Sequence, residues 1–245
     1  MSPRRIAFVL TALVVTALTL PAEAGRGCTE TGRMIGYRRC MSLAYLDDSE
    51  VARWTLTPFV FYAGLEPGAR FTGNAQTLSD MEHYALDPTH GTPLHFGGAG
   101  LRIGGFAWRG LSIAGDVRFG LATVSPSSER VSPTLRARSA DQAGYVAVGL
   151  YSGYTVSLGW VSLRGEIGVG LREAWVNTFV QYGEELGSSG VHAFHAYAAV
   201  RALVDVFVGP NASITLGAEC DFLPMPALVA TVGFTHHGRA FDLLR

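Results

Sequence analysis

The chain has 245 residues, of which 48% are hydrophobic and only 16% are charged, and its formal net charge is −1 at pH 7. This length suits one large domain, and all-β barrels often reach it as a single domain. Nineteen basic residues balanced by 20 acidic ones leave no strong basic field, so nucleic acid is not an expected partner.

The N-terminus has the features of a secretory signal peptide. Arg4 and Arg5 precede an apolar run over residues 6–20, and an Ala-x-Ala pattern follows at residues 22–24. We therefore expect residues 1–24 to be removed after export. An uncleaved membrane anchor is the alternative, although the run is short for a spanning helix.

Residues 25–53 form a polar, glycine-rich N-terminal segment that we expect to be periplasmic and to contain two cysteines, Cys28 and Cys40. Close cysteines in an oxidising compartment predict a disulfide. A lipid anchor on Cys28 is the alternative. Cys220 lies in an apolar segment, where a cysteine is most often a small buried hydrophobe.

From residue 54 to the end, the dominant pattern is alternation of apolar and polar residues, which predicts β-strands. Most of the alternating segments are long enough to cross a bilayer as tilted strands. Eight such segments cover residues 54–65, 96–107, 111–124, 144–158, 161–174, 192–208, 212–222 and 227–239.

The connections between these segments alternate in length. Three are short and contain glycine, at residues 108–110, 159–160 and 209–211, as expected for hairpin turns. Three are long, at residues 66–95, 125–143 and 175–191. Short turns at one end and long loops at the other are typical of an outer-membrane barrel with periplasmic turns. Trp54, Trp108 and Trp160 fall at the short-turn end and Trp175 at the other, which predicts aromatic girdles.

The apolar faces of the strands carry no charge, whereas the opposite faces combine small residues with arginine and acid. A lipocalin-like soluble barrel would have the same period with its apolar faces inward. A water-facing exterior would normally carry many charges, so we place the apolar faces in lipid and the charges in the lumen. The predicted lumen network contains Arg102, Asp116, Arg118, Arg164, Glu166, Arg172, Arg201, Asp205 and Glu219.

Counting back from the turns sets the register of two hairpins. Pairing Ala107 with Leu111 puts Arg102 opposite Asp116, and pairing Val208 with Ala212 puts Arg201 opposite Glu219. Opposite charges at facing positions stabilise neighbouring strands. The turn at residues 159–160 similarly puts Tyr151 opposite Gly168, where an aromatic ring can cover a strand glycine.

This pattern resembles that of the small eight-stranded outer-membrane barrels, the OmpA-like and OmpX-like superfamily, over residues 54–245. The resemblance implies an up-and-down transmembrane barrel inserted by the barrel-assembly machinery, although the chain ends in Arg245 rather than in the usual aromatic residue. An eight-stranded barrel is narrow enough for side chains to fill it. We therefore expect a monomer of structural or surface-interaction type, whose long loops contact any extracellular ligand, and no cofactor.

A lipid-modifying enzyme at the outer rim is the alternative function, since a nucleophile needs a base within hydrogen-bond reach. His192 and His195 lie at that rim but on opposite faces of one strand, whereas His236 and His237 lie near the other end. No pair has tight metal-ligand spacing, so we assign no catalytic or metal residue. The remaining polar candidates at the rim are Asp80, Glu82, His83, Asp87, His90 and His95.

Overall fold

The computed structural model describes residues 53–65, 71–76, 81–86, 94–108, 111–124, 128–130, 135–157, 161–182, 185–209, 212–222 and 226–239. Almost all of them lie in strands: β1 (Arg53–Leu65), β2 (Phe71–Gln76), β3 (Met81–Leu86), β4 (Leu94–Trp108), β5 (Leu111–Thr123), β6 (Ser128–Arg130), β7 (Leu135–Ser157), β8 (Val161–Tyr182), β9 (Glu185–Gly209), β10 (Ala212–Phe222) and β11 (Ala227–Arg239). The signal-peptide segment, Cys28, Cys40 and the C-terminal Arg245 lie outside these residues.

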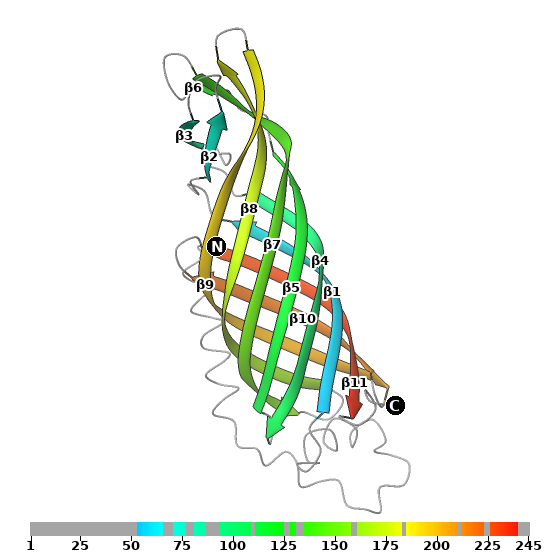
Figure 1. The fold of residues 1–245 in the computed structure, drawn as a ribbon. Coiled ribbons are helices and arrows are strands. Elements are labelled where there is room, and N and C mark those ends of the chain that lie inside the picture. The colour runs from blue at the N-terminus through cyan, green and yellow to red at the C-terminus, as the bar shows by residue number, and fades with distance from the viewer. Residues whose placement is uncertain are drawn as a thin grey trace, which may run out of the picture.

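Eight of the strands close into an antiparallel barrel, which confirms the predicted fold class (Figure 1). The order around the ring is β1-β4-β5-β7-β8-β9-β10-β11, and β11 pairs with β1 to close it. Each strand pairs with its neighbour in this series, as expected for an up-and-down barrel. No helix in the described part of the chain is long and apolar enough to cross a membrane.

The apolar faces of the barrel strands point outward. Leu121, Leu150, Ile167 and Phe194, each from a different strand, are more than 60% exposed. The alternate positions on the same strands point inward and are mostly buried. This direction overturns the lipocalin-like alternative, which requires the apolar faces to line the interior.

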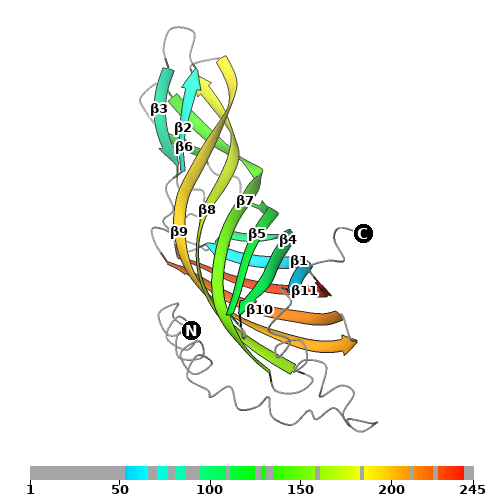
Figure 2. The same cartoon turned by 60° about the horizontal axis from the view of Figure 1, so that its bottom comes forward.

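Strands β7, β8 and β9 continue well beyond the barrel and form a projecting sheet with β6, β2 and β3 (Figures 1 and 2). The order in this sheet is β6-β7-β8-β9-β2-β3. The expectation of a long loop over residues 175–191 is therefore wrong, because only residues 183–184 separate β8 from β9. Alternation continues past Ala174, where Val176, Thr178 and Val180 face inward and are buried.

The hairpin registers follow the predicted counting except next to the turns. Arg102 pairs with Asp116, and Arg201 pairs with Glu219. The predicted pairs Ala107–Leu111 and Val208–Ala212 are wrong, since Leu111 pairs with Trp108 and Ala212 pairs with Gly209. A β-bulge in each hairpin takes up the extra residue beside the turn and leaves the register beyond it unchanged.

Candidate functional site in the barrel lumen

The structure places all nine residues of the predicted network inside the barrel, where each is buried. It adds a tenth, Asp221, which lies two positions beyond Glu219 on the inward face of β10. Five arginines therefore meet five carboxylates among the described buried residues. Alternation along β10 was the signal that would have identified Asp221, which makes the number of carboxyl groups equal to the number of arginines.

The centre of the network connects opposite walls of the barrel. Arg118 on β5 donates two hydrogen bonds to Glu219 on β10, at 2.7 and 2.8 Å. These strands lie four places apart in a ring of eight. The same guanidinium donates to Asp116 at 3.2 Å and to the Tyr151 hydroxyl at 2.7 Å. Bidentate arginine–carboxylate pairs combine strength with a fixed geometry, so this contact holds the two walls at a set distance.

Arg201 on β9 joins the two carboxylates that Arg118 contacts. Its Nε donates to Glu219 at 2.5 Å, and its Nη2 donates to Asp116 at 2.5 Å. Its guanidinium carbon also lies 3.6 Å from the centre of the Tyr151 ring, a cation–π distance. Two arginines thus share two acids, and no charge at the centre lacks a partner.

The remaining arginines form pairs on either side of the centre. Arg102 pairs with Glu166 across the lumen rather than with Asp116, the residue opposite it on the next strand. Arg164 donates to Asp205 at 2.5 Å, toward the end where β4 and β5 are joined. The register of neighbouring strands cannot predict the first of these partners, because β4 and β8 are not adjacent.

Arg172 and Asp221 form the pair nearest the projecting sheet, with a distance of 2.9 Å between Nη1 and Oδ2. Both side chains are buried, and the Arg172 guanidinium also lies over the Tyr197 ring. The Tyr197 hydroxyl is 3.1 Å from that of Tyr151. Two tyrosines therefore link this outer pair to the charges at the centre.

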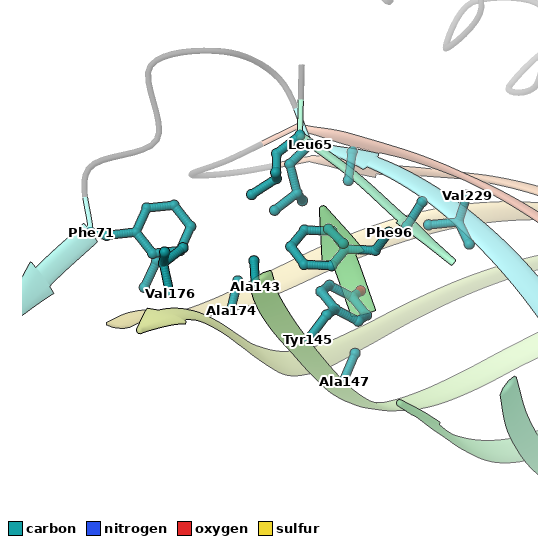
Figure 3. Packing of buried hydrophobic residues seen from close by; sticks show 14 of the residues in the cluster. Leu65, Phe71, Phe96, Ala143, Tyr145, Ala147, Ala174, Val176 and Val229 are labelled. Atoms are coloured by element: carbon teal, nitrogen blue, oxygen red, sulfur yellow. The ribbon is translucent and has the colours of Figure 1, made fainter. Parts of the chain in front are cut away.

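The lumen differs in chemistry on the two sides of the network. Toward the β4–β5 turn it is lined by hydroxyls, and Thr215 bonds to both Asp205 and Thr235. Thr235 bonds in turn to Thr57, which extends this chain to the first strand. Toward the projecting sheet the lining is apolar, and Figure 3 shows Phe96 and Tyr145 packed among small alanines and aliphatic side chains.

Side chains occupy the described lumen at two levels. Charged side chains in its middle form ion pairs with one another, although several of their buried polar atoms, including Arg102 Nη1 and Arg172 Nη2, have no hydrogen-bond partner. The apolar packing that follows contains Leu65, Phe71 and Phe96, each almost fully buried. A barrel of eight strands leaves about enough room for such side chains and little more.

The described tryptophans lie on the outward faces. Trp54 is at one end of the barrel, where its indole covers Gly238. Trp175 is on β8, where its indole covers Gly144, the residue paired with it on β7. Trp175 does not end its strand as expected, since β8 continues to Tyr182. The side chain of Trp108 and the whole of Trp160 lie outside the described part, so the girdle stays a prediction.

The described rim histidines do not form one site. His95 stacks on Tyr62 on the outside of the barrel. His192 also faces outward, where its Nδ1 is 2.8 Å from Glu173, whereas His195 faces inward at the position paired with Arg172. Within the described ranges, no three His, Cys, Asp or Glu residues are grouped as metal ligands would be. Asp80, Asp87 and His90, and the side chains of Glu82 and His83, lie outside those ranges.

A hydrogen bond between a serine and a histidine lies away from the rim, at the opposite end of the barrel. Ser213 Oγ is 2.8 Å from His237 Nε2 inside the barrel, near the β9–β10 turn, where Phe207 stacks on the imidazole. Ser213 has no exposed surface. A nucleophile must reach its substrate, so this pair serves as a structural contact in the lumen.

No protein-family model and no curated protein matches the chain. Solved structures do. In fold, the chain resembles the small eight-stranded outer-membrane barrels. The attachment invasion locus protein Ail of Yersinia pestis is 12% identical with a TM-score of 0.43, and the match covers 76% of this chain and 99% of Ail.

Two other outer-membrane barrels are similar to the same degree. For Neisserial surface protein A the identity is 11% and the TM-score 0.47, with 75% of this chain and 96% of that protein covered. For OprG from Pseudomonas aeruginosa the identity is 10% and the TM-score 0.39, and the match covers 78% of this chain and 98% of OprG. Identities this low concern the fold alone, and the functional assignment depends on the geometry of this chain.

Proposed function

We propose that the chain is a monomeric outer-membrane barrel of structural or surface-interaction type, with a lumen closed to solutes and a projecting sheet that makes its external contacts. The observation that carries this proposal is the reversal of polarity across the wall. Buried, paired charges lie inside and exposed aliphatic side chains lie outside. A protein in water has the opposite arrangement.

The lumen network supports a role in stability rather than in transport. Burying charged groups is costly unless each has a partner, and the ion pairs join strands across the barrel as well as neighbouring strands. A rigid, closed barrel is a suitable base for the projecting sheet. Strands β7, β8 and β9 carry that sheet, and their lengths of 22 to 25 residues exceed the 11 to 15 residues of the other barrel strands.

The route to the membrane is part of the same proposal. Residues 1–24 direct export and are removed, Cys28 and Cys40 form a disulfide in the periplasmic segment, and the barrel-assembly machinery inserts the barrel. The polarity of the wall supports this route, because such a barrel can fold stably only in lipid or detergent. Comparing the mass of the mature chain under reducing and non-reducing conditions tests both the cleavage and the disulfide.

Single-channel recording tests the closed lumen. The mature chain is refolded in detergent, its folding is checked by heat-dependent migration on a gel, and it is inserted into a planar bilayer. We expect no steady ion current from the folded barrel. A stable open conductance in each insertion would contradict the proposal, and a chain that stays folded and soluble without detergent would contradict its location.

A further inference from the structure

The outward face of the projecting sheet carries exposed cations beside an exposed aromatic ring. Arg136 and Arg138 on β7 are both exposed. Their register partners on β8 are Gln181 and Phe179, and Phe179 is 54% exposed. No carboxylate in the described part of the chain forms an ion pair with either arginine. Among the described residues, the sheet therefore presents two exposed guanidinium groups beside one ring.

This face continues the lipid-facing surface of the barrel. On β8, Ile167, Val169, Leu171, Trp175 and Phe179 lie on the outward side, with the polar Glu173 and Asn177 between them. Phe179 and Gln181 lie four and six residues beyond Trp175. At about 3.3 Å per residue and a tilt of about 40°, they stand roughly 10 to 15 Å above that indole. With Trp175 at the edge of the hydrocarbon, the arginines lie outside the apolar layer, at a height that only large headgroups reach.

Ser128 on β6, which is exposed, occupies the position paired with Arg138. Two exposed cations close together on one face attract anions. Arginine is suited to phosphate, which it binds in a planar, two-pronged geometry.

We propose that Arg136, Arg138 and Phe179 form a site for the phosphorylated sugar headgroups of the lipids that surround the barrel in the outer leaflet. The guanidinium groups bind the phosphates, and the aromatic ring packs against the apolar face of a sugar. This inference rests on the proposed function, because it requires the projecting sheet to stand outside the outer membrane. The site faces sideways, over the surrounding leaflet, so a lipid reaches it more readily than a soluble anion does.

The test measures thermal unfolding of the barrel in phosphatidylcholine vesicles with and without lipopolysaccharide. We expect lipopolysaccharide to raise the unfolding midpoint by several degrees and removal of its phosphates to abolish most of that rise. The double variant Arg136→Gln/Arg138→Gln should lose the rise while keeping its midpoint in plain vesicles. The variant Ser128→Ala, on the same face and without a change of charge, should show the full rise in unfolding midpoint. Replacement of both arginines by lysine should retain only part of that rise.

Other outcomes would overturn the inference. A double variant that keeps the full rise would show that the headgroups bind elsewhere. An equal rise with inorganic phosphate in plain vesicles would identify a site for soluble anions. A chain that fails to fold into vesicles at all, judged by gel migration, would refute the proposed function and this inference together. A folded chain that does not respond to lipopolysaccharide would refute the inference alone.

Discussion

Arg118 and Glu219 meet across the lumen from opposite walls of the barrel, through two hydrogen bonds of 2.7 and 2.8 Å. Neither side chain has appreciable exposed surface. The pair is also the centre of a larger set, since Asp116, Tyr151 and Arg201 all contact one or both of its members. Removing the charge of Arg118 or Glu219 therefore leaves a buried charge without its ion-pair partner.

The variant Arg118→Leu should therefore lower the free energy of unfolding strongly. Removing one partner of a buried ion pair typically costs about 3–5 kcal/mol, because the remaining charge stays buried. The measurement is urea unfolding in detergent micelles, followed by tryptophan fluorescence. The matched control is Arg136→Leu, at an exposed position on β7, which should change the value by no more than about 0.5 kcal/mol. Equal effects of the two variants would contradict a structural role for the network.

The pair of Arg172 and Asp221 should act as a unit. We expect Arg172→Gln and Asp221→Asn each to destabilise the barrel, and the double variant to cost less than the two together. Coupling energies between residues in contact are about 0.5–3 kcal/mol. A double-mutant cycle in urea measures this value. Strict additivity of the two changes would mean that the 2.9 Å contact contributes nothing to stability.

A side chain at Gly168, which lies beneath the Tyr151 ring, should destabilise the barrel. A Cβ added at Gly168 would lie 2.3 Å from the Tyr151 ring and 2.7 Å from the Leu150 carbonyl oxygen. The ring cannot easily move away, because Arg118 and Arg201 hold it. We expect Gly168→Ala to cost about 1–3 kcal/mol, as overpacking does.

Gly97→Ala is the control for that substitution. Gly97 lies on the outward face of β4, where an added Cβ meets no atom within 4 Å. The unfolding free energy of this variant should stay unchanged or rise slightly, since alanine restricts the unfolded chain. If Gly97→Ala lowered the free energy of unfolding as much as Gly168→Ala, the cost would come from the backbone conformation of strand glycines and not from contact with Tyr151.

Period-two alternation was sufficient to predict the barrel, because a wall between lipid and lumen forces each strand to alternate along its whole length. The same parity predicted that Glu166 and Arg164 would face inward. It could not predict that Arg102 pairs with Glu166, since contact across a lumen depends on the diameter and shear of the closed barrel. The polar residues after Trp175 led to the prediction of a loop. The β-branched residues Val176, Thr178 and Val180, at alternate positions, indicate instead that β8 continues.

The most direct test of the membrane assignment compares two arginine substitutions at exposed positions. Leu150 lies midway along the barrel part of β7 and is 65% exposed, whereas Asn177 is exposed on β8 just beyond Trp175. The measurement is the free energy of unfolding of Leu150→Arg and Asn177→Arg in phospholipid vesicles. We predict a loss of about 2–4 kcal/mol for Leu150→Arg and of about 0–1 kcal/mol for Asn177→Arg, since an arginine costs most at the bilayer midplane. Equal and small losses at both positions would mean that water, not lipid, covers the barrel wall.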